Sequence, residues 1–294
     1  MADFSPEELS ALERTVRAAA QLHEQKSRRS DGVYTRFFHL DHFCDLYPDL
    51  SVKYTDYPFM KTECLALQRL YDLANKDGDA APLVPRVVHY FHGSGEDCWG
   101  YMIMERVHLR EVSVDELCRK AAEAVLWLRA QRMDFFGSLG GANARHTVFQ
   151  GGKAPKVFTS VLAAQEYLNV AVRRVQGRRP SWMPPLAEVT LEDEDIVLTQ
   201  SDMDVSNFGV ALDGRAVVFD AATIQALPKT LADYTLLRTT TFAKAVSAYV
   251  FDTHQSASLL ASLNFASLDE VRRRLSTGDD DLGVDENGNI KHAR

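Results

Sequence analysis

The sequence predicts an α+β protein of two lobes, a smaller strand-rich lobe followed by a mainly helical one. Its 294 residues correspond to about two domains by the usual length prior. Extended segments fall mostly in the first third of the chain, helical periodicity dominates the remainder, and a β-hairpin signal comes late. We place the lobe boundary at residue 106, so that residues 1–106 form the first lobe and residues 107–294 form the second.

Composition and charge narrow the classes of function. The formal net charge is −8, with 33 Lys and Arg against 41 Asp and Glu. Because Lys and Arg are not in excess, we expect no general binding of nucleic acid. No apolar run is long enough to span a bilayer and no signal segment is evident, so we expect a cytoplasmic protein without membrane contact. The four cysteines form no CxxC pair, which favours free thiols in a reducing compartment.

The first lobe is expected to begin with a helix and continue as extended structure. Ser5-Pro6-Glu7-Glu8 has the residues of a helix start, with Ser as the cap and Pro at the first helical position. Residues 33–40 and 50–54 are candidate strands, and Lys53 lies in the second.

A helix predicted over residues 58–74 carries Glu63 on its mainly apolar face. Burying a lone carboxylate is costly, so we expect Glu63 to have a cationic or hydrogen-bonding partner. Residues 86–91 and 99–107 then predict a hairpin that ends at the lobe boundary.

The second lobe is expected to be mostly helical, with one loop-rich insertion. Ser113 and Glu116 fit a capping box at a helix start. Residues 133–158 are rich in glycine, which predicts turns, and the isolated His146, next to Arg145, is expected to be structural or exposed rather than a substrate contact. Further helices are predicted over residues 159–175, 229–251, 256–263 and from 267 onward, and the tail from residue 277 is expected to fray.

Three polar residues surround the late hairpin, in residues 196–223. Asp213-Gly214 between two apolar runs is a strong signal for a two-residue hairpin turn. Asn207 follows Asp202 by five residues, and Asp220 follows Asn207 by thirteen, at the far end of the hairpin. Phosphoryl transfer uses such groups, because one carboxylate can take a proton from a hydroxyl while a carboxylate and an amide oxygen hold Mg²⁺. Ordinary polar turn residues are the alternative interpretation.

This segment resembles the pattern H-G-D-x-x-x-x-N, followed by a metal-binding Asp, of the aminoglycoside phosphotransferase and choline-kinase family, with Gln200-Ser201-Asp202 in place of His-Gly-Asp. The stretches TECLALQRL and GYMIMERV are similar to fungal members of this group. The resemblance implies a two-lobed protein-kinase-like fold, with a small antiparallel sheet in the N-terminal lobe and a mainly helical C-terminal lobe. It also implies ATP and Mg²⁺ as cofactors, and transfer of the ATP γ-phosphate to a hydroxyl of a small molecule.

The resemblance assigns a role to each candidate residue. Lys53 would contact the nucleotide phosphates while paired with Glu63 on the next helix, and the backbone of a hinge after the last strand would bind adenine. The full set is Asp202 as the catalytic base, Asn207 and Asp220 as metal ligands, and Lys53, Glu63, Glu105 and Val107 as nucleotide-binding residues.

Two departures from the family pattern leave an alternative open. No GxGxxG loop precedes Lys53, where Gly32 is the only glycine, and Gln200 replaces the usual His before the catalytic Asp. Both departures favour a catalytically inactive pseudokinase that binds nucleotide or acts as a scaffold. An unrelated α+β enzyme with a chance motif is a third interpretation, and the sequence does not name the acceptor.

Overall fold

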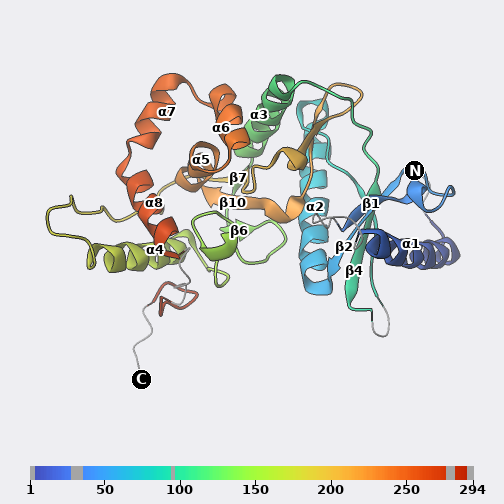
Figure 1. Cartoon of the computed structure of the whole chain (residues 1–294), viewed down its shortest axis with the longest axis horizontal. Coiled ribbons are helices and arrows are strands. Elements are labelled where there is room, and N and C mark those ends of the chain that lie inside the picture. The colour runs from blue at the N-terminus through green and yellow to red at the C-terminus, as the bar shows by residue number, and fades with distance from the viewer. Residues whose placement is uncertain (1–3, 28–35, 94–96, 276–281, 290–294) are drawn as a thin grey trace.

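The computed structural model describes residues 4–27, 36–93, 97–275 and 282–289, which fold into two lobes (Figure 1). The smaller lobe consists of α1 (Pro6–Ser27), β1 (Phe37–His39), β2 (Leu50–Asp56), α2 (Tyr57–Asp77), β3 (Val87–His92) and β4 (Trp99–Glu105). The larger lobe consists of α3 (Val114–Ala130), β5 (Arg132–Met133), β6 (Gly137–Ser138), α4 (Val161–Gln176), β7 (Ile196–Gln200), β8 (Phe208–Val210), β9 (Ala216–Val218), β10 (Ile224–Pro228), α5 (Lys229–Arg238), α6 (Thr241–Val250), α7 (Thr253–Leu260) and α8 (Leu263–Leu275).

The sheet of the smaller lobe is antiparallel, in the order β1-β2-β4-β3. Successive side chains of a strand point to opposite faces, so the two faces of β2 differ. Val52 pairs in register with Phe38 and Ile103, and this face is buried beneath α1. Lys53 pairs in register with Phe37 and Met102 on the opposite face. The register therefore directs Lys53 away from α1.

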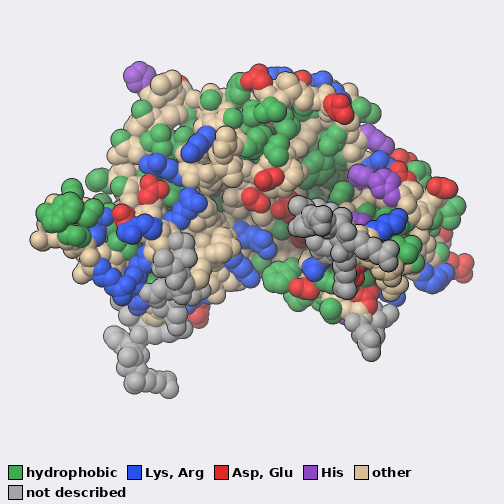
Figure 2. All heavy atoms as spheres, in the orientation of Figure 1, with side chains coloured by type: hydrophobic (Ala, Val, Ile, Leu, Met, Phe, Trp, Pro, Cys, Tyr) green, Lys and Arg blue, Asp and Glu red, His purple; other side chains and the backbone are tan. Residues whose placement is uncertain are grey.

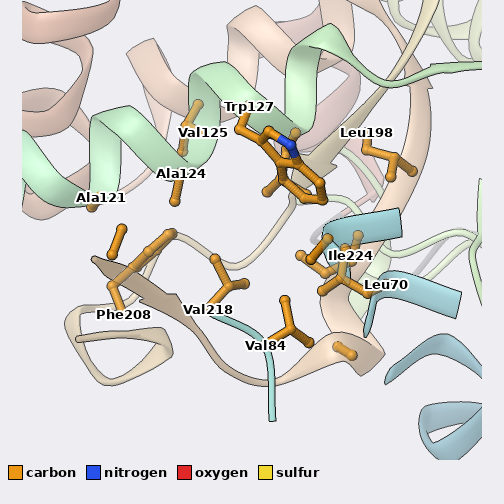
Figure 3. Packing of buried hydrophobic residues seen from close by; sticks show 14 of the residues in the cluster. Leu70, Val84, Ala121, Ala124, Val125, Trp127, Leu198, Phe208, Val218 and Ile224 are labelled. Atoms are coloured by element: carbon orange, nitrogen blue, oxygen red, sulfur yellow. The ribbon is translucent and has the colours of Figure 1, made fainter. Parts of the chain in front are cut away.

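Helix α2 lies between the small sheet and the larger lobe, and its apolar face belongs to a core shared by both (Figure 1). Figure 3 shows Leu70 of α2 and Val84 close to Trp127 of α3 and Val218 of β9. Gly140 permits a close approach on the other flank of the helix, because a Cβ atom there would lie 2.0 Å from the carbonyl oxygen of Thr62. The helix that carries Glu63 is thus fixed against both lobes.

The larger lobe holds a four-stranded sheet in the order β5-β7-β10-β6 and the two-stranded hairpin β8-β9. Strand β7 leads into the predicted catalytic segment, and β10 pairs with it antiparallel from Ile224 to Pro228. Helices α4, α5 and α8 enclose a second apolar core around Tyr167, Tyr234 and Phe265. None of the described helices is long and apolar enough to cross a membrane.

The structure confirms the two-lobed α+β fold predicted from the sequence, with a small antiparallel sheet and a mainly helical second lobe. Several predicted bounds are wrong. The strand expected over residues 33–40 is limited to β1, and residues 33–35 lie outside the described residues. The last helix begins at Leu263 rather than near Ser267, because Ser267 is buried and its hydroxyl donates to the carbonyl of Ala187.

The C-terminal tail also differs from the prediction of fraying, within residues 282–289. Leu282 and Val284 are buried in the second core. The Lys156 ammonium donates to the carbonyl of Val284, and the Thr159 amide donates to the carbonyl of Glu286 at 3.1 Å. The composition of this segment, rich in Asp, Gly and Asn, predicts a frayed terminus. Two buried side chains and these backbone hydrogen bonds hold it in place instead.

Candidate active site

A three-residue ion cluster joins the two lobes. The Lys53 ammonium on β2 lies 2.5 Å from Oε1 of Glu63 on α2 and 2.7 Å from Oδ1 of Asp220, which follows β9. Glu63 is buried, whereas the side chains of Lys53 and Asp220 are 29% and 25% exposed. Lys53 is therefore the partner that Glu63 needs on the apolar face of α2. The same ammonium group also contacts the carboxylate of Asp220, which is far away in the sequence.

The cluster carries one cation and two carboxylates, and the pKa values respond to this balance. Burial by itself would lower the pKa of Lys53, but Glu63 and Asp220 outweigh it, so the pKa is raised and the amine stays charged. Burial favours the neutral form of Asp220, yet the adjacent Lys53 holds the pKa of Asp220 below its ordinary value. Burial raises the pKa of Glu63, and Lys53 opposes this. The net negative charge suits a divalent cation.

Asp220 has an unusual backbone conformation. Its φ of 52° and ψ of 62° lie in the left-handed region, and it is the one non-glycine residue with positive φ among those described. Asp tolerates this region better than most residues, at a cost of about 1 kcal/mol. The Thr223 hydroxyl, 3.2 Å from Oδ2 and 2.8 Å from the carbonyl oxygen of Asp220, holds the turn. This conformation directs the carboxylate back to Lys53.

Asp202 and Asn207 lie on the loop between β7 and β8. The side-chain amide of Asn207 donates to the carbonyl of Asp202 at 2.9 Å, and Asn207 is buried. The Phe219 amide donates to the carbonyl of Asn207 at 2.9 Å, which fixes the loop to the residue before Asp220. The spacing of these three polar residues in the sequence thus corresponds to one continuous hydrogen-bonded unit.

Asp202 is exposed, and its environment disfavours ionisation. Partial burial of its carboxyl group raises its pKa, the charges of Asp220 and Asp204 add to the rise, and Arg145 opposes it. The hydrogen bonds from Asn207 to the Asp202 carbonyl and from the Phe219 amide to Asn207 bring the two carboxylates into one region of the molecule. A carboxylate with a raised pKa is the kind of group that accepts a proton as a general base.

Gln200 occupies the position where the family pattern has His. It is fully buried, its Nε2 donates to the carbonyl of Phe219 at 3.3 Å, and its Oε1 accepts from the amide of Asp202 at 3.3 Å. One side chain therefore connects the backbone next to Asp220 with the backbone of Asp202. The amide of Gln meets both needs, since it donates and accepts at once.

The two predicted hinge residues, Glu105 and Val107, lie outside the cluster of Lys53, Glu63 and Asp220. The carboxylate of Glu105 pairs with Arg86 at 2.8 Å. Glu105 and Val107 line a cleft of about 540 Å³ together with the end of α2 and the β8-β9 turn, and neither Lys53 nor Asp220 lines it. The structure thus brings together Lys53 and Glu63 with Asp202, Asn207 and Asp220. The adenine-binding role of Glu105 and Val107 stays a prediction.

A metal ion would find two oxygen donors here, the Asp220 carboxylate and the Asn207 amide. Among the residues that the structure describes, no group of three or more His, Cys, Asp or Glu side chains is arranged to hold a metal ion by itself. Mg²⁺ does not need such a cage, because it is commonly bound by one or two carboxylates together with substrate phosphates and water. The donor set and the excess of negative charge fit Mg²⁺ bound together with a nucleotide.

His146 is structural, as expected. It is buried, its Nε2 lies 3.0 Å from the carbonyl of Leu231, and its Nδ1 accepts from the amide of Val148 at 3.2 Å. An acceptor role for Nδ1 leaves the proton on Nε2, and burial lowers the pKa to about 4. Two neighbouring residues, Arg145 and Lys153, were not assigned a role from the sequence, since this glycine-rich stretch shows no periodicity.

Comparison with known proteins gives structural likeness alone. No protein-family model matches the chain, and no curated protein matches it in sequence. The solved structures that it resembles include a thermostable mutant of the aminoglycoside phosphotransferase APH(4)-Ia in a ternary complex with AMP-PNP and hygromycin B, with 14% identity, TM-score 0.46, and coverage of 77% of this chain and 76% of that chain.

Two further structures are similar at the same level. One is the GDP and kanamycin complex of APH(2")-IIia, with 14% identity, TM-score 0.45, and coverage of 80% of this chain and 82% of that chain. The other is a putative fructosamine-3-kinase from Thermobifida fusca, with 13% identity, TM-score 0.40, and coverage of 79% of this chain and 81% of that chain.

Proposed function

We propose that this protein is a Mg²⁺-dependent phosphotransferase that moves the γ-phosphate of ATP to a hydroxyl of a small molecule. The observation that carries the proposal is the Lys53 ammonium, which is held between Glu63 and Asp220 across the two lobes. Asp202 and Asn207 lie on the loop tied to the same carboxylate. A cation for phosphates, oxygen donors for a metal and an exposed carboxylate are the parts that this reaction needs.

Each residue has a distinct task in this function. Lys53 would bind the nucleotide phosphates while Glu63 fixes its position, and Asn207 and Asp220 would hold Mg²⁺. The bound ion would neutralise charge on the phosphates. Asp202 would take the proton of the acceptor hydroxyl while the hydroxyl oxygen forms a bond to the γ-phosphorus. The bond between that phosphorus and the bridging oxygen of ATP would break, which releases ADP. The backbone at Glu105 and Val107 is the proposed contact for adenine.

The lobe boundary at residue 106 and the fungal-type affiliation belong to the same proposal. Segments such as TECLALQRL and GYMIMERV support the affiliation. A cytoplasmic location is proposed because the reaction needs a supply of ATP.

A pseudokinase that binds nucleotide without transferring phosphate is the second candidate. It is favoured by the absence of a GxGxxG motif before Lys53. The hydrogen bonds of Gln200 to Phe219 and Asp202 weaken the other reason for it, because they supply the support expected of His at this position.

Phosphate transfer from γ-labelled ATP distinguishes the two candidates. The protein is incubated with Mg²⁺ and a panel of anionic, neutral and cationic hydroxyl compounds, and water serves as the background acceptor. We expect labelled product from the native chain and at least a ~100-fold loss in Asp202→Asn, equal to ~2.7 kcal/mol of transition-state stabilisation. Asp252→Asn is the matched control, since Asp252 is exposed and caps the start of α7, a role that Asn can keep. Equal rates in native protein and Asp202→Asn would contradict the proposal.

A further inference from the structure

The glycine-rich stretch that precedes α4 forms a rigid hairpin rather than a loose loop. The side-chain amide of Asn143 donates a hydrogen bond to the carbonyl of Ala154 at 2.9 Å, and the amide of Ala154 donates to the carbonyl of Ala144 at 2.8 Å. The His146 amide donates to the carbonyl of Gly152 at 2.9 Å. Ala144, Ala154 and His146 are buried. Residues between these contacts are therefore held in fixed positions.

Arg145 and Lys153 lie opposite each other in this hairpin. They form an antiparallel bridge, and residues directly opposite in such a pair have Cβ atoms about 5 Å apart on the same face. Two like charges in this arrangement repel each other. Among the described residues, neither side chain forms an ion pair with a carboxylate. The hairpin thus places two positive charges side by side, and no described carboxylate forms an ion pair with either.

The two cations lie at the edge of the candidate active site. Arg145 is attached to β10, whose first residue, Ile224, pairs with Gln200, two residues before Asp202. Its backbone amide donates to Oε1 of Gln225 at 3.0 Å, on the strand that follows Asp220. The Lys153 ammonium lies 5.2 Å from the ring centroid of Phe59, on α2. Figure 2 shows basic and acidic side chains close together on the face where the lobes meet.

From this arrangement we propose that the acceptor molecule carries an anionic group, a carboxylate or a phosphate, which Arg145 and Lys153 bind while its hydroxyl faces Asp202. The inference rests on the proposed phosphotransferase function. Arg presents a planar fork that matches a carboxylate or phosphate, and Lys adds a point charge. A polycationic acceptor, such as the kanamycin named in one of the similar structures, would be repelled by the same pair.

Binding of inorganic phosphate, measured by calorimetry, tests the inference without knowledge of the acceptor. Saturating Mg²⁺ and a non-hydrolysable ATP analogue are added first, so that Lys53 is occupied. We expect phosphate or acetate to bind the native protein, and about tenfold weaker binding in Arg145→Met with Lys153→Met, a change of ~1.4 kcal/mol. Tighter binding of phosphate indicates a phosphorylated acceptor, and tighter binding of acetate indicates a carboxylic acid.

Lys244→Met is the matched control, because Lys244 is exposed on α6. It should bind phosphate like the native protein, and nucleotide affinity should be equal in all variants. Equal anion affinity in the native and double-variant proteins, absence of binding of both anions, or tighter binding of kanamycin than of either anion would overturn the inference. Failure of the nucleotide analogue to bind would instead overturn the proposed function, and the anion titrations without nucleotide would still report on Arg145 and Lys153.

Discussion

Two charged clusters in this protein have opposite composition. At the lobe interface, Lys53 is held by two carboxylates, Glu63 and Asp220. Within the larger lobe, the Asp233 carboxylate is held by two cations, Arg129 of α3 and Lys229 of α5, the latter at 2.7 Å. The first cluster has an excess of negative charge and the second an excess of positive charge.

Exposure separates the two clusters further. The Asp220 side chain is 25% exposed, whereas the Asp233 side chain is 1% exposed. Asp220 also has a left-handed backbone, and Asp233 lies in an ordinary helix. A sealed carboxylate bound by two cations stabilises the lobe, whereas a partly open carboxylate in a negatively charged cluster can exchange Lys53 for another cation. The comparison therefore assigns stability to Asp233 and supports the proposed metal-binding role of Asp220.

The largest expected effect is on stability, from Asp233→Ala. Removing this carboxylate leaves Arg129 buried without its partner, and breaking a buried ion pair in this way costs about 3–5 kcal/mol. Urea unfolding followed by circular dichroism measures the loss. The folded fraction should keep its nucleotide affinity. A loss of stability below ~1 kcal/mol would mean that the two clusters do not differ as described.

Asp220→Asn should have the reverse effect, on activity rather than stability. Asn tolerates the left-handed conformation and keeps the shape of the side chain, and Lys53 retains Glu63, so the free energy of unfolding should fall much less than in Asp233→Ala. Loss of the carboxylate proposed to bind the metal should slow phosphate transfer at least ~100-fold, or ~2.7 kcal/mol. Initial rates with labelled ATP and parallel urea unfolding check both parts, and a large loss of stability at full activity contradicts them.

His146 should dominate the response of stability to mild acid. Its pKa is about 4 in the folded protein and near 6.5 when unfolded, so the unfolded chain binds the proton more readily. Stability should fall as the pH drops from 6.5 to 4, by up to about 3 kcal/mol. His146→Gln should flatten this slope. Asp220, whose pKa is lowered, contributes stability that is lost only at more acidic pH, so the two groups separate in a plot of unfolding free energy against pH.

The smallest expected effect comes from Gln200→Leu. Its two hydrogen bonds, each 3.3 Å long, position Asp202 and the residue before Asp220, and their loss should cost about 1–2 kcal/mol. The loss should appear in kcat more than in the KM for ATP, because Gln200 is fully buried and acts through the backbone of Asp202 and Phe219. Gln200→His should retain more activity than Gln200→Leu. A purely structural role would lower stability and leave kcat unchanged in both.

The sequence predicted those parts of the site that depend on short spacing. Asp202 and Asn207 lie on one loop, and Glu63 stands out because its helix face is otherwise apolar. Lys53 was identified by its order before that helix, and the structure places its ammonium against Glu63 and Asp220. The α+β class was likewise predicted from the extended segments in the first third of the chain and the helical periodicity of the remainder.

Other features depend on contacts that no local pattern encodes. Arg145 and Lys153 are brought together by a hairpin whose contacts join residues without periodicity. The tail residues Leu282 and Val284 are buried although their segment is polar, because α4 and α8 leave an apolar surface that they cover. The cleft behind Glu105 combines segments from both lobes, so its shape follows from packing alone.

The most direct test of the central claim is thermal unfolding of the native protein with ATP, with and without Mg²⁺. If the Lys53 and Asp220 cluster binds the Mg²⁺ nucleotide, ATP at 100 times its Kd raises the free energy of unfolding by about 2.7 kcal/mol. The shift should require Mg²⁺ and should be reduced in Asp220→Asn but not in Asp252→Asn, at the exposed start of α7. No shift at saturating nucleotide, or an equal shift in Asp220→Asn, would contradict the assignment of this cluster as the nucleotide site.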